Sequence, residues 1–428
     1  MSNSPKLSLM SAILININIM LGSGIFINTV LLAAAAGALG GFVYAFVGLL
    51  IFPLIFTMAR LMTYHEGGTF YEFGKTLHPF IGFLSSWCYF TAKLASSALG
   101  IHIFVTLMQQ LFESLQGISG LYLKLALVAV FTVLNLQNIR VGKYIQYSFI
   151  ILKSIPLLFV FYAFWTFKPT TVITSEAYRW SGIFKTIPFV LFAFSGFEAS
   201  CSLSRSIKNP AKNGPLAIFI SFSIVLAVVI LYQSLFYYQL PGIIDGFDSF
   251  YQAFEALLAQ GHFTPNRYEV WKTFIFIGIA SSALGASYGI MYSNAWNLYA
   301  LAAKNTLPFS SYFTDVNACQ TPYLCILAEG ALMSVYLILT YGNQVPLQQI
   351  SALGSAIAYT ISVASFVLAS VFIDAYEWYM GVAALFSCLL LLYAALTNGL
   401  AYGMHGYIIY TVIILFGISL YYLKINQE

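Results

Sequence analysis

Apolar residues fill most of the chain in long runs that short polar segments separate. A helix needs about 20 apolar residues to cross the hydrocarbon core of a bilayer, so the runs predict an all-α integral membrane protein with twelve membrane-spanning helices. The expected spans are residues 8–37, 38–61, 80–112, 121–138, 143–167, 182–202, 215–238, 270–303, 323–341, 348–373, 377–397 and 402–424. The third and eighth runs exceed the length of one crossing, which predicts tilted or extended helices.

Glycine interrupts two of these runs near their middle. The first break is Gly-Ser-Gly-Ile-Phe at Gly22–Phe26, and the second is Ser-Gly-Phe-Glu at Ser195–Glu198. A helix broken inside a membrane leaves backbone N–H and C=O groups that hydrocarbon cannot satisfy, so we expect a polar ligand at each break. Two such breaks, about 170 residues apart, are typical of secondary transporters built from two halves, which bind substrate near the bilayer midplane.

The composition agrees with a membrane protein. Hydrophobic residues make up 60% and charged residues 7% of the 428 positions, whereas soluble domains carry about 25% charged residues. The formal charge of +4 is too small and too dispersed to predict a nucleic-acid partner. Basic residues favour the loops on the side of the two termini, which predicts a cell (inner or plasma) membrane protein with both termini in the cytoplasm. A single membrane domain, residues 1–428, accounts for the whole sequence.

The two breaks offer complementary chemistry for a zwitterion. The half-helix that follows Gly24 presents free N–H groups and the positive end of its dipole, which suit a carboxylate. Unwound carbonyls at the second break can accept an ammonium group. Glu198 lies deep in an apolar run, where an acid costs at least about 2.5 kcal/mol, so we expect it to take up a proton or to brace the unwound segment. The alternatives are close helix packing through the glycines and a purely structural role for Glu198.

Five motifs occur in the order found in a known family. They are the two breaks, Glu66–Phe73, Lys208–Pro215, and Tyr299–Pro308 followed by Thr321-Pro322-Tyr323. With these motifs the chain resembles the amino-acid permeases of the amino acid–polyamine–organocation (APC) superfamily over nearly its whole length. The resemblance implies the leucine-transporter (LeuT) fold: two inverted repeats of five helices, residues 8–167 and 182–373, followed by two peripheral helices in residues 377–424.

The resemblance also implies how a substrate is held. Gly22 and Gly196 would open the two helices. The backbone amides that would bind the α-carboxylate of an amino acid are those of Ser23, Gly24 and Ile25. The carbonyls that would bind its α-amino group lie near Met20, Phe192 and Ser195. Phe192 matches the aromatic gate of some relatives, whereas packing in lipid or in the core is the more common fate of a phenylalanine.

Two lysines lie inside predicted spans. Lys153 resembles the ammonium that replaces a sodium ion between spans one, five and eight in permeases without sodium coupling, since a fixed cation would repel Na⁺ there; buried lysines also release protons readily. Lys93 falls where span three lines the pocket, and would favour an acidic or polar substrate side chain. The alternatives are extension of Lys153 to the membrane surface, and pairing of Lys93 with Glu198 or a backbone carbonyl.

These features lead to the hypothesis of a secondary active transporter that carries a zwitterionic amino acid across the lipid bilayer by alternating access. Protons or exchange, rather than sodium, would drive it. An amino acid/amine antiporter is the alternative. A channel is less favoured because polar residues cluster at the breaks, and a nutrient sensor is less favoured because we expect no soluble signalling domain. No metal, cofactor or enzymatic activity is expected, because no acidic, histidine or cysteine constellation has suitable spacing. Glu329, a further intramembrane acid, is expected to be structural.

Overall fold

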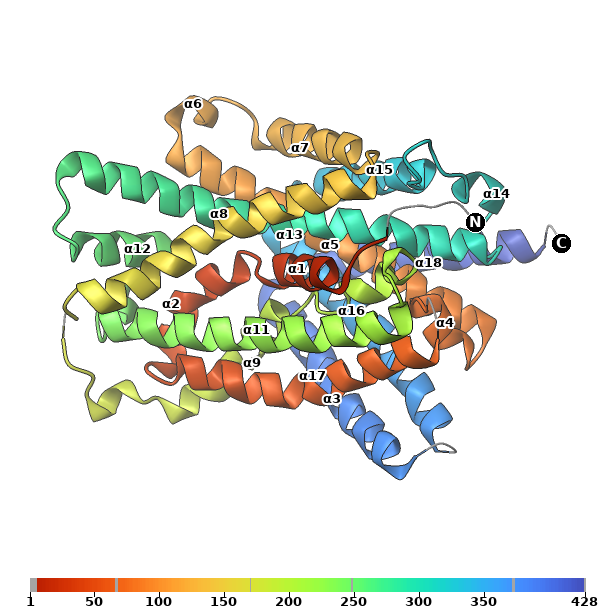
Figure 1. Ribbon diagram of the computed structural model, residues 1–428, viewed down its shortest axis with the longest axis horizontal. Coiled ribbons are helices and arrows are strands. Elements are labelled where there is room, and N and C mark those ends of the chain that lie inside the picture. Colours follow the sequence, from red (N-terminus) through yellow and green to blue (C-terminus); the bar gives the residue numbers. More distant parts are fainter. Residues whose placement is uncertain (1–5, 66–67, 170, 248, 372–373, 427–428) are drawn as a thin grey trace.

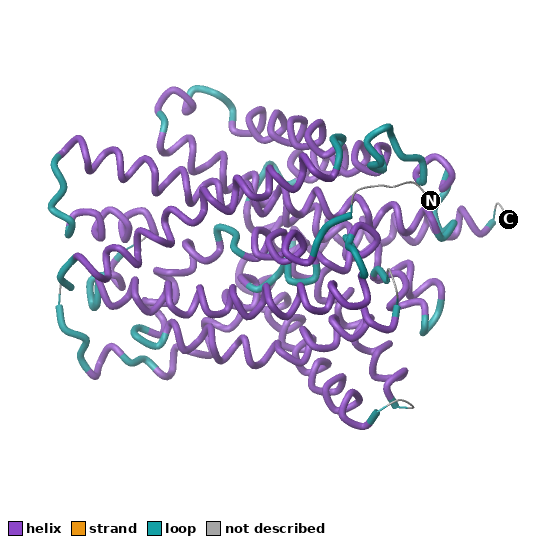
Figure 2. Tube along the Cα trace, viewed as in Figure 1, coloured by secondary structure: helices purple, strands orange, loops and turns teal. Residues whose placement is uncertain are grey.

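Long apolar helices dominate the structure, a computed structural model that describes residues 6–65, 68–169, 171–247, 249–371 and 374–426. Eight helices within these ranges are long and apolar enough to cross a membrane. They are α3 (Gly40–Tyr64), α5 (Pro79–Leu111), α8 (Ile139–Thr166), α11 (Pro210–Gln239), α13 (Pro265–Ala303), α16 (Gln344–Ser370), α17 (Ala375–Tyr402) and α18 (His405–Ile425). Helix accounts for most of the described chain (Figure 2).

The remaining predicted spans correspond to shorter or interrupted helices. The first consists of α1 (Leu9–Met20) and α2 (Gly24–Ala36), which meet at an angle of 48°. Two apolar helices, α7 (Gly120–Asn135) and α15 (Tyr323–Leu339), are shorter than a full crossing. The sixth span, expected as residues 182–202, is only partly helical: α9 (Ile183–Ala193) and α10 (Ala199–Ser202) flank the second break. The structure therefore confirms an all-helical membrane fold, while the count of twelve crossings stays a prediction.

Short helices occupy the connections. They are α4 (Phe70–Lys75), α6 (Glu113–Gln116), α12 (Phe250–Ala259), α14 (Ser310–Phe313) and the 3₁₀ turns η1 (Ser175–Ala177), η2 (Trp180–Gly182), η3 (Ser204–Ser206) and η4 (Ile244–Gly246). Two of them, η4 and α12, lie in the long connection after α11. The motif expected at Glu66–Phe73 begins outside the described residues, because Glu66 and Gly67 are not part of them.

Local sequence signals explain where the long helices begin. Pro79, Pro210 and Pro265 are the first residues of their helices, where the missing N–H costs no hydrogen bond and the fixed φ suits a helix. Asn138 caps α8, and its Oδ1 accepts hydrogen bonds from the N–H groups of Arg140 (3.0 Å) and Val141 (3.1 Å). The third and eighth runs form the two longest of these helices, of 33 and 39 residues, as expected.

The two broken helices lie in the middle of the bundle (Figure 1). Helix α1 packs against α8, α11 and α13, and α2 packs against α9. Helices α5 and α13 form an extensive contact beside them, whereas α18 packs mainly on α16 and α5. Both termini lie at one end of the bundle, together with α4 and α14, and we call this the terminal end; α12 lies at the opposite, distal end (Figure 1).

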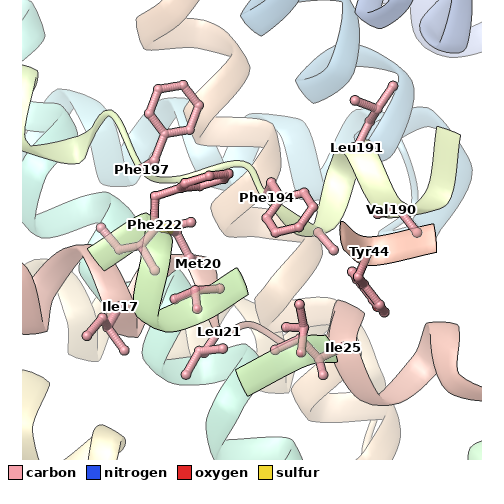
Figure 3. Packing of buried hydrophobic residues seen from close by; sticks show 14 of the residues in the cluster. Ile17, Met20, Leu21, Ile25, Tyr44, Val190, Leu191, Phe194, Phe197 and Phe222 are labelled. Carbon is pink, nitrogen blue, oxygen red and sulfur yellow. The ribbon is translucent and has the colours of Figure 1, made fainter. Parts of the chain in front are cut away.

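Apolar side chains from several helices surround the breaks. Figure 3 shows Met20 and Ile25 from the first broken helix among aromatic side chains of the second break, α3 and α11. The ring of Phe194 packs against Tyr44 at a centroid distance of 6.0 Å and against Phe222 at 5.5 Å. This core isolates the unwound backbone, so its polar groups must be satisfied by protein or ligand.

Candidate functional site

The first break is a short turn between α1 and α2. The N–H of Gly22 donates to the carbonyl of Met20 (2.8 Å), and the carbonyl of Ser23 accepts from the N–H groups of Phe26 (3.0 Å) and Ile27 (3.1 Å). Helix α2 begins at Gly24, and the first N–H groups of a helix have no acceptor inside it. They therefore form an anion-binding end at the centre of the protein.

The second break is braced by its own carboxylate. Gly196 has a φ of +118°, a conformation that side-chain-bearing residues rarely adopt. Its N–H donates to Glu198 Oε2 (3.0 Å), and the hydroxyl of Tyr89 on α5 donates to Glu198 Oε1 (3.1 Å). The fully buried Glu198 side chain thereby holds the turn in shape, which is the bracing role considered from the sequence.

A buried asparagine joins the two breaks. Asn16 on α1 donates through Nδ2 to the carbonyl of Phe197 (3.1 Å) and accepts at Oδ1 from the hydroxyl of Ser200 (3.1 Å). Asn28 on α2 makes a similar link, with its Nδ2 donating to the carbonyl of Phe189 on α9 (3.1 Å). Side chains of the first broken helix therefore hydrogen-bond to the backbone of the second and fix the position of the two helices relative to each other.

A small cavity of about 70 Å³ opens between the breaks. Helices α5 and α13 complete its wall. Six residues expected at the site line it: Met20, Gly22, Ser23, Gly24, Lys93 and Ser195. Ile25 lies just outside, with its side chain buried in the apolar core. The backbone of α9 includes Phe192, but the side chain of Phe192 is outside the described part of the structure, and its gating role stays a prediction.

Lys93 carries the charge nearest to this cavity. Its ammonium lies 2.5 Å from Glu198 Oε1 and donates to the hydroxyl of Ser195 (2.9 Å). Only 3% of the Lys93 side chain is exposed, so the pair is screened from water. The sequence left two alternatives for Lys93, lining the pocket or pairing with Glu198. In the structure Lys93 does both. The pair leaves this wall polar but without net charge.

Lys153 lies beside the first break and is buried. Its ammonium donates to the carbonyls of Asn18 and Leu21, both at 2.7 Å. Ser282 on α13 donates to the same Leu21 carbonyl (2.6 Å). These carbonyls belong to the last turn of α1, where a helix end presents negative partial charge. An ammonium from α8 therefore sits where α1, α8 and α13 meet, and does not extend to a membrane surface.

The glycines of the two breaks differ in how closely the protein approaches them. A Cβ built on Gly24 would meet nothing within 4 Å. The space beside Gly24 therefore belongs to the cavity, where a ligand can approach the backbone, and is not filled by protein. A Cβ on Gly196 would lie 2.5 Å from Cγ2 of Ile19. Gly196 lies outside the cavity wall, and its missing side chain allows the two broken helices to pack closely against each other.

A larger cavity of about 520 Å³ lies between α3, α9, α16 and α17. Its wall is mainly apolar, and it reaches Ser195 and Tyr359 from the side away from the first break. It contains none of the backbone of that break. The smaller cavity is therefore the candidate site, because only there do both unwound segments and a buried ion pair converge.

Hydrogen bonds and ion pairs join several elements at the terminal end of the bundle. The N–H of Leu7 donates to the carbonyl of Ser206 (2.7 Å), and the N–H of Lys208 donates to the carbonyl of Leu7 (2.9 Å). Glu72 on α4 pairs with Lys304 and, at 3.4 Å, with Lys75. Burial alone raises the pKa of Glu72, but these cations outweigh it and lower the pKa below its usual value.

The sequence matches the amino acid permease family over residues 7–427. The chain belongs to the amino acid permease family. It is 24% identical over 230 residues to the D-serine/D-alanine/glycine transporter of Escherichia coli K12, covering 50% of this chain and 48% of that protein. It is 27% identical over 237 residues to an uncharacterized transporter of Mycobacterium bovis, covering 53% and 51%. The chain thus spans about half the length of these relatives.

This match confirms the resemblance drawn from the motifs and makes the permease a multi-pass membrane protein. Several polar residues at its site were not singled out from the sequence: Asn16, Asn18, Tyr89, Ser282 and Asn28. The three asparagines could have been found, because an amide inside an apolar span needs a partner. Tyr89 and Ser282 carry no such signal among the many tyrosines and serines of the chain.

Proposed function

We propose that this amino acid permease is a secondary active transporter that carries a small neutral amino acid across the cell membrane by alternating access. The observation that carries the proposal is the cavity between the breaks. The N-terminal end of α2 faces one side of it, and the second break with the Lys93–Glu198 pair faces the other. A zwitterion satisfies both sides, with its carboxylate on the α2 amides and its ammonium near unwound carbonyls.

The size and charge of the cavity support a small, neutral substrate. A volume of about 70 Å³ is far below the 300–1,000 Å³ that is usual for drug-sized ligands. Because Glu198 neutralises Lys93, the wall offers no free cation for an acidic side chain. Relatives named as D-serine/D-alanine/glycine transporters support the same substrate class. We therefore propose a small neutral substrate in place of the acidic or polar one that Lys93 alone suggested.

Lys153 supports a cycle without sodium. Its ammonium already donates hydrogen bonds to two carbonyls at the end of α1. A sodium ion bound beside these carbonyls would be repelled by the ammonium. The energy then comes from protons or from exchange of one amino acid for another. The terminal end carries Lys6, Lys75, Arg205 and Lys208, which supports a cytoplasmic location for it.

Uptake by the purified protein in proteoliposomes tests this proposal. Liposomes loaded with unlabelled glycine should accumulate labelled glycine by counterflow, and alanine or serine should compete far better than leucine, glutamate or arginine. Replacing sodium by choline should leave the rate unchanged. Equal competition by leucine, or uptake that needs sodium, contradicts the proposal.

A further inference from the structure

A second acid lies deep in the protein, away from the cavity. Glu329 on α15 has a fully buried side chain, and its carboxyl group forms no ion pair among the described residues. The ion pairs of the described chain do not involve it: the buried cation Lys93 pairs with Glu198, and Lys304 pairs with Glu72. Glu198 is held by a cation, a tyrosine hydroxyl and a backbone N–H, whereas the polar side chain beside Glu329 is the neutral amide of Asn294.

Within the described part of the chain, the groups beside Glu329 include no cation. Cys325 lies one turn earlier on α15, Asn294 approaches from α13, and Thr132 packs beside the neighbouring Gly330 from α7. The other charged or titratable groups on the helices packed against α15 lie elsewhere. Lys124 on α7 lies near Gly342, beyond the end of α15, and His102 on α5 lies toward Lys124. An isolated carboxylate in such a place is so costly that the group takes up a proton instead.

Polar side chains connect this region to the substrate cavity. Asn294 lies beside Glu329, and its Oδ1 accepts from Nδ2 of Asn297 (3.0 Å). The same Nδ2 of Asn297 donates to the hydroxyl of Ser202 on α10 (2.9 Å). Ser202 lies against Tyr89.

From Tyr89 the chain continues to the cavity itself, because the Tyr89 hydroxyl donates to Glu198, the partner of Lys93. Seven side chains, Glu329, Asn294, Asn297, Ser202, Tyr89, Glu198 and Lys93, thus run from α15 to the site. A change of charge at one end alters which acceptors are free at the other.

A cavity at the terminal end comes within one helical turn of Glu329 on α15. A cavity of about 260 Å³ lies there, and Ile326, one turn before Glu329, forms part of its wall. Asn135 lines the same cavity with both side-chain amide atoms unpaired and 95% of the residue buried, since 5% of it is exposed. A polar group of that kind is usually satisfied by water.

We propose that Glu329 is a proton-binding site of the transport cycle, loaded in this conformation and emptied into the cavity at the terminal end. The proton leaves a carboxyl oxygen of Glu329 for a water molecule in that cavity. The carboxylate that remains is an acceptor only. It attracts the second Nδ2 hydrogen of Asn294, whose Nδ2 also donates to the carbonyl of Phe90 at 3.0 Å, and so shifts the Asn294 side chain toward α15. That shift reaches Glu198 through Asn297, Ser202 and Tyr89 and couples proton release to the cavity.

The inference rests on the proposed transport function, and its test separates the two. Proteoliposomes with full-length protein receive labelled glycine under two conditions: counterflow at equal pH on both sides, and uptake driven by an inside-alkaline gradient of one pH unit. One proton per substrate allows accumulation of up to about tenfold per pH unit. Absence of counterflow contradicts the transport proposal, whereas counterflow without any gradient effect contradicts only the inference.

The decisive variant is Glu329→Gln, which keeps the shape of a protonated carboxyl but cannot release a proton. It should retain counterflow and lose the accumulation driven by the gradient. The matched control is Glu377→Gln on α17, whose carboxylate pairs with Arg60 away from the cavity, and it should keep both activities. Gradient-driven accumulation by Glu329→Gln at the parent level, or equal loss of both activities, overturns the proposal.

A measurement on the parent protein covers the case in which Glu329→Gln does not fold. Glycine added to purified protein in weakly buffered detergent solution should change the number of bound protons, which a pH indicator reports. Acetate at the same concentration is the control and should give no such change. Glycine binding without proton release or uptake at any pH between 5 and 8 overturns the proposal.

Discussion

The two breaks have similar glycine signatures but are stabilised in different ways. At the first break the positive charge of Lys153 is held by backbone carbonyls, and Gly24 borders open space. At the second break Glu198 is held by Lys93, Tyr89 and a backbone N–H, and Gly196 has no room for a side chain. The first break is thus shaped to receive a ligand, whereas the second is shaped to stay folded.

This difference teaches that glycine in a broken helix has two separate purposes. Gly24 leaves space that a substrate can fill, and Gly196 permits both a left-handed backbone and contact with Ile19. Substitutions at the second break should therefore act on stability, and substitutions at the first break should act on binding or rate.

The largest effect is expected for Lys93→Ala. Removing one partner of a buried ion pair leaves Glu198 unpaired and costs about 3–5 kcal/mol. The thermal unfolding temperature of the purified protein should fall strongly, and competition by glutamate, leucine and arginine should weaken to the same extent. A selective loss of glutamate binding would show that Lys93 reads the substrate side chain.

The double variant Lys93→Ala/Glu198→Gln sharpens this result. It removes both charges, so it should be more stable than Lys93→Ala alone. A double variant that is no more stable than the single one would mean that the pair is not the source of the loss.

Gly196→Ala should come next. The left-handed conformation costs about 1–3 kcal/mol for a residue with a side chain, and overlap with Ile19 adds about 1–3 kcal/mol. The unfolding temperature should fall while any folded fraction still binds glycine. Gly246→Ala, at a glycine with open space around it, is the control and should leave stability unchanged. Normal stability of Gly196→Ala is incompatible with the geometry of the second break.

Lys153→Ala should lower both the rate of transport and the stability. It removes two hydrogen bonds from a charged donor, each worth about 1.5–3 kcal/mol when the partners are otherwise satisfied. Counterflow should fall at least about tenfold. Lys143→Ala, at a half-buried lysine near the start of the same helix, should be near normal. If sodium restores the variant or accelerates the parent, Lys153 does not substitute for an ion.

Gly24→Val should have the smallest effect on folding. No protein atom lies within 4 Å of the added Cβ, so the unfolding temperature should match that of the parent. The valine side chain would instead occupy the cavity, and glycine affinity should fall by at least about tenfold, or 1.4 kcal/mol. Unchanged glycine affinity would place the substrate somewhere other than this cavity.

Much of the fold could be predicted from the sequence, because the length of an apolar run is set by the thickness of the bilayer. The spans at residues 80–112 and 323–341 agree closely with α5 and α15. The run at residues 182–202 does not form one helix, because Gly196 and Glu198 stabilise a turn that hydropathy cannot detect.

The position of the site could be predicted from the sequence, but the contacts between its charged side chains could not. The motifs placed Gly22, Ser23, Gly24 and Ser195 around one cavity, since unwound backbone must meet a polar partner. Sequence left open whether Lys93 faces substrate or Glu198, because that depends on angstrom-scale geometry between α5 and the second break. The roles of all these residues in transport stay predictions.

The central claim is that the two breaks bind the two charged groups of one small amino acid. Calorimetric titration of the purified protein with glycine, glycine methyl ester and acetate tests it most directly. Glycine should bind, while the ester, which lacks the carboxylate, and acetate, which lacks the ammonium, should each bind at least about a hundredfold more weakly, or 2.7 kcal/mol. Binding of either analogue as tightly as glycine would contradict the claim.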